Sequence, residues 1–452
     1  MKDAIELKAE IEKILPKRLK GVLECYGFNL QELLTPLKWK PLVLIIGNYS
    51  SGKSTFINEF IGKDIQRTGQ APTDDCFTIL TAPEEGEGPG DITGNTVVSD
   101  ARLPFAGLRK FGEKFLSHLV MKRTESEKLK DIAIIDTPGM LDSVTEQDRG
   151  YDFLGVVGEL AKLSDLIVLM FDPHKAGTIK ETYKVLRMTL PVSAGEDRVV
   201  FVLNRIDECE NLEDLVRAYG TLCWNLSQMT GRKDIPRIYL TYAQIPGREV
   251  PPEFQVWEKE REELKKALLS APRMRLFHML QEVDRVSRQL VLVIRAMEGF
   301  KEHFVKRLKG FLKSLAVTGA FSFLLGDLIM HLVSGYPEKP FLAHLVSGNL
   351  SVDTFFWPVI WLLLTIGAGS LYFQKVTFPR LENRFVSAPD ELVKLESAYD
   401  RDLWERVRSK VVGLLKKEAR HQIWVRHKRQ LSKVERFINT DLQAFYDRVK
   451  RF

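Results

Sequence analysis

Cysteine is scarce in this sequence, and no pair of cysteines has the spacing of a metal site. The four cysteines of the 452-residue chain stand apart and form no CxxC pair: Cys25, Cys76, Cys209 and Cys223. This pattern indicates neither a zinc site nor a disulfide framework, so we expect a reducing compartment. The N-terminus also lacks the apolar run of a secretory signal. Internal repeats and low-complexity tracts are absent as well, which excludes a repeat architecture.

Net charge is low for this length, at +6, but it is unevenly distributed. Residues 374–452 contain 19 Lys and Arg against 11 Asp and Glu, so the basic excess belongs to this part of the chain. Within Leu403–Arg429, nine basic residues stand against two acidic ones and alternate with Trp404 and Trp424. Lipid contact and packing in a helical stalk explain this stretch equally well. Nucleic acid is not expected as a partner, because no recognised binding fold accompanies the charge.

Apolar runs separated by helical stretches predict an α/β domain. Pro41–Ile46 is an unbroken apolar run, as is typical of a strand covered on both faces. Similar runs follow at Ile132–Ile135, Asp165–Phe171, Arg198–Leu203 and, more weakly, Arg237–Leu240. We therefore expect an α/β domain with a mostly parallel sheet and helices on both faces. The phosphate-binding motif at residues 47–54 makes this a predicted P-loop G domain. Helical periodicity before Lys40 and after Pro252 predicts an additional α-helical stalk.

Residues 47–54, GNYSSGKS, fit the phosphate-binding pattern GxxxxGK[ST] between a predicted strand and a predicted helix that starts near Thr55. The glycines let backbone N–H groups curl around phosphate oxygens, and the helix N-terminus adds partial positive charge. Lys53 can reach the β- and γ-phosphates, and the Ser54 hydroxyl can coordinate Mg²⁺. The predicted nucleotide contacts in this loop are Gly47, Asn48, Ser50, Ser51, Gly52, Lys53, Ser54 and Thr55.

Two further segments complete the predicted phosphate and Mg²⁺ site. The sequence Asp136-Thr-Pro-Gly139 ends a predicted strand, where the aspartate can hold Mg²⁺ through a water and the Gly139 N–H can sense the γ-phosphate. Thr73 lies between this motif and the P-loop, where a switch threonine coordinates Mg²⁺ through its hydroxyl. A capped turn is the alternative for the Thr73 segment, since Thr and Asp are good turn residues.

The sequence Asn204-Arg-Ile-Asp207 ends another predicted strand, at the place where a base-recognition loop belongs. Asp207 can accept two hydrogen bonds from guanine N1–H and N2–H, a pairing that adenine does not offer. Arg205 stands where lysine is usual, and its stem can lie along the face of the base. The same pattern also occurs in ordinary turns, but the strand before it favours base recognition.

A long uncharged run predicts a membrane segment. Phe355–Phe373 contains 19 residues without a charge, and as a helix it spans about 28 Å, close to the ~30 Å hydrocarbon core. Ala316–Val333 is similarly apolar but contains Asp327 and His331, and a charge inside a membrane span is costly. Basic residues flank the pair, so the positive-inside rule predicts a transmembrane hairpin with the G domain and both termini on the cytoplasmic side. The alternatives are a buried hairpin in a soluble stalk and a paddle that enters one leaflet.

These motifs, in this order, resemble the EHD family of dynamin-related ATPases that act on membranes. The resemblance covers roughly residues 10–300, and its segments are KPLVL (40–44), GNYSSGKSTFI (47–57), PTDDCF (72–77), RGYDF (149–153), SDLIVLMFDPHK (164–175) and LSAPR (269–273). It implies a dynamin-type G domain flanked by a helical domain from both ends of the chain, with nucleotide-dependent dimers or scaffolds on membranes. It also implies phosphate and Mg²⁺ roles for Ser50, Lys53, Ser54, Thr73 and Asp136, with Ser50, Lys53 and Thr73 in the catalytic set.

The sequence departs from this family at three places. Asp74 stands where the family tends to have a second threonine, and a carboxylate there repels the γ-phosphate unless Mg²⁺ intervenes. Asn48 replaces the usual glutamine of the P-loop. No C-terminal EH domain with EF-hand loops is recognised, so recruitment by short peptide motifs is not expected. EHD proteins favour ATP although they keep an aspartate like Asp207, so the base stays open between GTP, which we favour, and ATP.

Together these features predict a membrane-anchored dynamin-like NTPase that remodels, tethers or fuses membranes through nucleotide-dependent G-domain dimerisation. Its expected cofactor is Mg²⁺, and its expected partners are a lipid membrane and further copies of the chain, as a homodimer or higher homo-oligomer. The expected segments are an N-terminal helical segment packed with the stalk (1–39), the G domain (40–250), the stalk (251–315), the hairpin or paddle (316–373) and a basic helical segment (374–452). The alternatives are a non-hydrolysing, nucleotide-switched scaffold or tether and a soluble regulatory GTPase.

Overall fold

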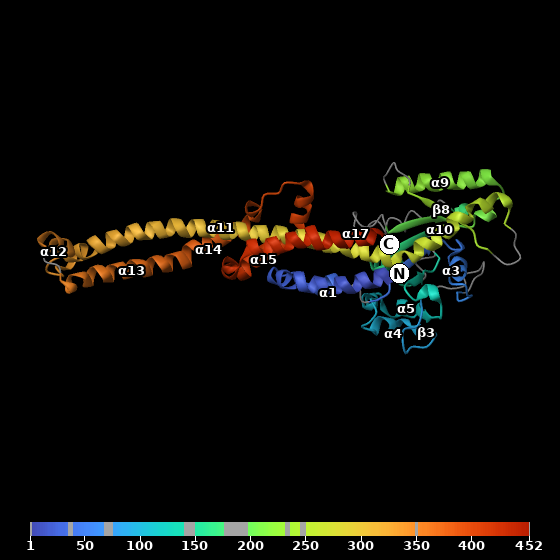
Figure 1. Ribbon diagram of the computed structural model, residues 1–452, viewed down its shortest axis with the longest axis horizontal. Coiled ribbons are helices and arrows are strands. Elements are labelled where there is room, and N and C mark those ends of the chain that lie inside the picture. The colour runs from blue at the N-terminus through green and yellow to red at the C-terminus, as the bar shows by residue number, and fades with distance from the viewer. Residues whose placement is uncertain are drawn as a thin grey trace. The chain divides into compact units, whose positions relative to one another are not determined.

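The chain divides into two compact units in the computed structural model (Figure 1). The structure describes residues 2–34, 39–66, 76–139, 150–175, 198–230, 236–244, 250–348 and 351–451. The sheet unit comprises Met1–Ile14, Gln31–Glu282 and Ala444–Phe452, and the helical unit comprises Leu15–Leu30 and Val283–Gln443. Each unit therefore combines segments that lie far apart in the sequence.

The sheet unit is built on one mixed β-sheet. Its described strands are β1 (Leu42–Gly47), β2 (Phe77–Thr81), β3 (Gly90–Thr93), β4 (Leu119–Arg123), β5 (Ala133–Asp136), β6 (Leu166–Phe171), β7 (Val199–Leu203) and β8 (Ile238–Leu240). Their order in space is β3-β4-β2-β5-β1-β6-β7-β8. The pairs β2–β5 and β3–β4 are antiparallel, and the remaining neighbours are parallel. The predicted mostly parallel sheet is confirmed.

Three of these strands, β2, β3 and β4, were not predicted from the sequence. The exposed edge strand β3 contains Gly90 and Asp91, and β4 ends in Lys122 and Arg123, so neither forms an unbroken apolar run. In β2 the residues are buried, but threonines interrupt the run. Their pairing with distant segments, rather than local hydrophobicity, decides that they are strands.

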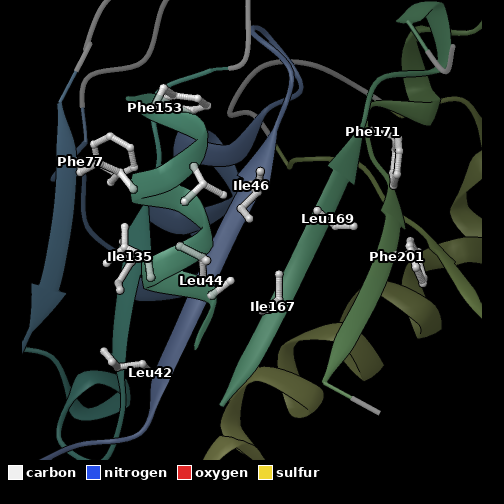
Figure 2. Close-up of a cluster of buried hydrophobic side chains, with 14 of the residues drawn as sticks. Leu42, Leu44, Ile46, Phe77, Ile135, Phe153, Ile167, Leu169, Phe171 and Phe201 are labelled. Carbon is white, nitrogen blue, oxygen red and sulfur yellow. The ribbon is translucent and has the colours of Figure 1, made fainter. Parts of the chain in front are cut away.

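Both faces of the sheet are covered by apolar helix faces, because neighbouring residues of a buried strand point to opposite sides. One core contains Leu44 and Ile46, and the other contains Val43 and Ile45. Figure 2 shows the first core, with Phe153 lying near Phe77 of β2. The helices that contribute to this core are α4 (Gly94–Ser99), α5 (Gly112–Leu116), α7 (Phe153–Leu163) and α9 (Leu212–Thr230). The second core takes α3 (Lys53–Ile61) and α10 (Glu258–Leu269). Helices on both faces are thereby confirmed.

The remaining described helices lie mainly in the helical unit, and α11 alone has 64 residues, about 96 Å at ~1.5 Å per residue. They are α1 (Lys2–Cys25), α2 (Leu30–Leu34), α11 (Ala271–Ser334), α12 (Phe341–Ser347), α13 (Phe356–Tyr372), α14 (Phe378–Ser387), α15 (Ala398–Trp424), α16 (His427–Arg436) and α17 (Gln443–Arg451). Short 3-10 turns are η2 (Ala106–Phe111), η3 (Glu127–Leu129), η5 (Pro173–Lys175), η6 (Ile206–Glu208), η7 (Pro252–Trp257), η8 (Val352–Phe355) and η10 (Pro389–Leu392). Two π turns are η9 (Phe373–Thr377) and η11 (Phe437–Leu442).

The end of α1 packs with the C-terminal helices inside the helical unit. The Tyr26 hydroxyl lies 2.6 Å from Nδ1 of the buried His427. The two tryptophans of the basic stretch behave differently. Trp404 is buried and donates from Nε1 to Asp390 at 2.7 Å, so it packs within the helical unit, whereas Trp424 is 84% exposed.

The hairpin within the helical unit is formed by the distal part of α11 and by α13, with α12 at its tip (Figure 1). The two long helices approach closely at glycine, since a Cβ on Gly326 would lie 2.6 Å from Trp361 Cγ. Asp327 is buried, and its Oδ2 accepts a hydrogen bond from the Phe341 N–H at the start of α12. By length and composition, the spans Ala271–Ser334 and Val352–Ser387 are long and apolar enough to cross a membrane.

Candidate nucleotide-binding site

The predicted site residues that the structure describes gather at one edge of the sheet. Strands β1, β5, β6, β7 and β8 run parallel, so their carboxyl ends meet at the same edge. These ends are Gly47, Asp136, Phe171, Leu203 and Leu240. In open α/β sheets this edge is where ligands bind.

The P-loop has the tight backbone that its glycines predict. A Cβ on Gly47 would lie 2.3 Å from the carbonyl oxygen of Met170, so only glycine fits there. Gly52 has φ +84°, in the left-handed region that favours glycine. Ser50 also has a positive φ, 62°, a conformation in which non-glycine residues are uncommon. Helix α3 begins at Lys53, slightly earlier than the predicted start near Thr55, and its N-terminus faces the loop.

The Lys53 side chain is turned inward onto the loop. Its Nζ is buried and donates to the carbonyl oxygens of Gly47 and Asn48, each at 3.0 Å. The ammonium therefore lies within the curl of the backbone that the motif predicts as the phosphate cradle. To contact a phosphate, it exchanges these carbonyls for the stronger charge-assisted hydrogen bonds of an anion.

The DTPG motif lies directly beside the P-loop. The Ser54 hydroxyl donates to Asp136 Oδ2 at 3.0 Å, and Thr137 Oγ1 donates to the carbonyl oxygen of Ile45 at 3.0 Å. A Cβ on Gly139 would lie 2.7 Å from Tyr49 Cα, so this glycine allows the close approach of the two segments. One hydroxyl and one carboxylate form the oxygen-only donor set with which Mg²⁺ is held beside phosphates, so these residues fit Mg²⁺.

The predicted base-recognition loop, Asn204–Asp207, is fixed to the P-loop by two side chains. Asn204 is buried and donates from Nδ2 to the Ser51 carbonyl oxygen at 2.9 Å. Arg205 has a left-handed backbone, with φ 63°, and its guanidinium donates to the carbonyl oxygen of Ser50 and to Asp172 Oδ2. Its stem also lies near Gly52. Asp207 follows in η6 and is half-buried.

Several residues of the site were not identified from the sequence. Thr241, directly after β8, is buried, and its hydroxyl donates to Asn204 Oδ1 at 3.0 Å. Burial and the neighbouring Glu258 raise the pKa of Tyr242 to about 12, so its phenol stays protonated and donates to Glu258 Oε2 at 3.0 Å. Gln66 donates to Asp136 Oδ2 at 2.8 Å. Asp172, which also bonds to Arg205, lies in a segment that resembles the EHD family, but the sequence predicted no role for this residue.

The structure thus brings together the P-loop, the DTPG motif and the NRID motif, which the sequence placed far apart. Thr73 and Asp74 lie outside the described residues, so their places in the site stay predictions. Among the described residues, three or more His, Cys, Asp or Glu side chains nowhere gather as a metal cluster.

Comparison with known proteins identifies this sheet unit. Residues 43–206 match the domain of the Dynamin family. The chain is 31% identical over 304 residues to EH domain-containing protein 2 of Arabidopsis thaliana, and 34% identical over 253 residues to human EH domain-containing protein 1. The chain contains an EHD-like G domain of the dynamin superfamily. The resemblance noted in the sequence is confirmed for this domain.

The matched region covers 65% of this chain and 54% of the Arabidopsis protein, and 55% of this chain and 46% of the human protein. The chain thus spans about half the length of the curated relatives that it matches. A solved bacterial dynamin pair, described as sensing and tethering membranes over long range, is 14% identical and covers 93% of this chain and 89% of its own, with a TM-score of 0.32.

Proposed function

We propose that the chain is a membrane-anchored dynamin-like NTPase that remodels, tethers or fuses membranes. The observation that carries the proposal is that an EHD-like G domain and an exposed apolar hairpin occur in one chain. Nucleotide binding orders the site, drives dimerisation of G domains and changes the position of the stalk on its anchor.

The substrate that we propose is GTP, with ATP as the alternative suggested by the EHD resemblance. Lys53 and the P-loop amides bind the phosphates, and Ser54 and Asp136 hold Mg²⁺, the latter through a water. Mg²⁺ supplies charge neutralisation at the transferred phosphoryl group. Ser50 and Thr73 complete the proposed catalytic set, and Asp207 contacts the base while Arg205 covers its face.

The exposure of the hairpin supports membrane insertion. In Val352–Ser387, 6% of the most apolar 18-residue window is buried, whereas the core helix of a soluble protein is mostly buried. Near the tip, Leu332, Val333, Val346 and Val352 are each at least 77% exposed. Basic residues before and after the hairpin, including Lys313 and Lys375, fit a cytoplasmic position for the G domain and both termini.

A surface on α9 supports dimerisation through the G domains. Leu212 and Val216 are four residues apart, so they are neighbours on this helix, and Trp224 follows about two turns later and is 66% exposed. An exposed tryptophan with aliphatic neighbours is typical of the anchor of a protein interface. A homodimer or higher homo-oligomer is therefore proposed as the working state.

The proposal is tested by measuring phosphate release from GTP and from ATP, with the full chain in liposomes and in detergent. We expect turnover with one nucleotide, faster on liposomes, and its loss in the Lys53→Ala variant. Turnover that does not depend on bilayers, together with extraction by salt alone, would instead support a soluble regulatory GTPase. Nucleotide binding without turnover would support the non-hydrolysing tether.

The choice between a spanning hairpin and a one-leaflet paddle is tested by cysteine labelling at the tip. A Ser347→Cys substitution in a chain whose native cysteines are replaced by serine places one thiol on α12. In sealed liposomes with the G domain outside, a spanning hairpin leaves this thiol accessible only from the lumen. A paddle leaves it protected from polar maleimides on both sides.

A further inference from the structure

We infer that Gln66 is a positioning residue of the Mg²⁺ site, which fixes the Asp136 carboxylate against Ser54 and connects it to strand β4 through Lys122. The inference rests on the proposed function, because it concerns the Mg²⁺ that accompanies the nucleotide. Gln66 belongs to none of the sequence motifs. Its side chain nevertheless contacts the carboxylate around which the proposed metal site is built.

The side-chain amide of Gln66 links two charged groups. Its Nε2 donates to Asp136 Oδ2 at 2.8 Å, and the same oxygen accepts from the Ser54 hydroxyl at 3.0 Å. On the other side, Lys122 Nζ donates to Gln66 Oε1 at 3.1 Å. An ammonium can only donate and a carboxylate can only accept, so the orientation of the amide is fixed without ambiguity.

The backbone of Gln66, in the segment after α3, is held equally firmly by Asn58 of that helix. Asn58 Oδ1 accepts from the Gln66 N–H at 2.9 Å, and Asn58 Nδ2 donates to the Gln66 carbonyl oxygen at 2.8 Å. Both residues are 5% exposed. A buried residue held at its backbone N–H, at its carbonyl and at both ends of its amide has little rotational freedom, so it can hold Asp136 in one rotamer.

This arrangement matters for Mg²⁺ because the ion demands near-ideal octahedral geometry and keeps several of its waters. With two donors on Oδ2, the Asp136 carboxylate cannot rotate freely. The Ser54 hydroxyl donates its hydrogen bond to Asp136 and keeps its oxygen lone pairs for the metal. Hydrogen-bond partners behind metal ligands typically change metal affinity by about 10–100-fold when they are removed.

The test uses the full chain in detergent and a fluorescent analogue of whichever nucleotide it binds. Nucleotide affinity is measured against Mg²⁺ concentration and also in EDTA. We expect Gln66→Leu to raise the Mg²⁺ concentration for half-maximal effect by about 10-fold or more, with affinity in EDTA unchanged. Lys122→Met, which leaves Gln66 in place, changes the Mg²⁺ requirement in the same direction by a smaller factor. The matched control is Gln255→Leu, because this exposed amide lies outside the site and donates to the Val250 carbonyl oxygen.

The possible results separate the two proposals. An equal loss of affinity with Mg²⁺ and in EDTA would show a merely structural role, and an unchanged Mg²⁺ requirement would also overturn the role of Gln66. If Gln66→Leu fails to fold by thermal melting, the Lys122→Met variant decides by the same two titrations. An unmodified protein that binds nucleotide without any dependence on Mg²⁺ would overturn the proposed function, and the role of Gln66 with it.

Discussion

Ser54 Oγ lies 3.0 Å from Asp136 Oδ2, and this hydrogen bond joins two motifs that are 82 residues apart in the chain. Ser54→Ala removes both the bond and the proposed Mg²⁺ ligand. We expect phosphate release to fall by at least about 100-fold, on the scale seen when one group that stabilises transition-state charge is removed. Nucleotide binding in EDTA should persist. Ser117→Ala, at an exposed serine outside the site, is the control. Equal turnover in the Ser54→Ala variant and its control would argue against Mg²⁺ coordination by this serine.

The first turns of α11 are anchored to the base of the sheet by a buried ion pair. Arg275 Nη2 lies 2.7 Å from Asp165 Oδ2, which also accepts from the Leu42 N–H at 2.8 Å. Arg275→Met removes the hydrogen-bonded cation of a buried carboxylate, a change that destabilises by about 3–5 kcal/mol. We expect the melting temperature to fall by roughly 10 °C. The double variant with Asp165→Asn should melt higher than Arg275→Met alone. A double variant that melts lower would show that the carboxylate is stable without its partner.

Trp224 provides a test of the proposed dimer. Truncating a central aromatic anchor costs about 2 kcal/mol, so Trp224→Ala should weaken nucleotide-dependent dimerisation by roughly 30-fold. Sedimentation velocity with and without nucleotide measures this change. The matched control is Trp424→Ala, since Trp424 is also exposed but lies in the helical unit. If both variants dimerise like the unmodified protein, the α9 face is not the contact.

The two hairpin helices offer a matched pair of glycines. A Cβ on Gly326 would lie 2.6 Å from Trp361 Cγ, whereas nothing lies within 4 Å of a Cβ on Gly367. Gly326→Ala should therefore separate the helices and destabilise the hairpin by about 1–3 kcal/mol. Gly367→Ala should be neutral or stabilising, because alanine favours helix by about 1 kcal/mol. Hydrogen exchange of α13 peptides in liposomes should accelerate only in the first variant. Equal exchange in both would show that Trp361 can move aside.

His427 makes the helical unit sensitive to acid. Its Nε2 must donate to the Gln422 carbonyl oxygen at 2.8 Å, so Nδ1 accepts from the Tyr26 hydroxyl at 2.6 Å, and both nitrogens are satisfied in the neutral ring. Burial lowers the pKa of His427 to about 4 from the ordinary value of 6.5. Between these values the unfolded chain binds the proton and the folded chain does not, so stability falls as pH decreases from 6.5 towards 4.

We therefore expect the melting temperature to drop between pH 7 and pH 5, and to drop less in His427→Gln, which cannot titrate there. His421→Gln, on the exposed surface of α15, serves as the control and should retain the full pH dependence. The same drop in all three proteins would assign the acid sensitivity to other groups.

Local sequence was sufficient for features that depend on local physics. Unbroken apolar runs predicted β1, β5, β6, β7 and β8, because strands buried on both faces require them. The P-loop and the DTPG and NRID motifs were found because phosphate binding requires glycine, lysine and serine at fixed spacing. The 19-residue uncharged run Phe355–Phe373 was recognised for the same reason, since length and composition are local.

Tertiary structure decided everything that depends on contacts between distant segments. The strands β2 and β4 form because they pair with other strands of the sheet, and their own residues do not predict this pairing. Gln66 and Thr241 enter the site only because the chain brings β5, the segment after α3 and the loop after β8 to one edge. A hydrogen bond is formed between atoms about 3 Å apart, and sequence order does not specify that distance. The sequence by itself thus determined the G domain and the apolar segments. The fold decided which side chains contact the Asp136 carboxylate, because those contacts join segments that are distant in the chain.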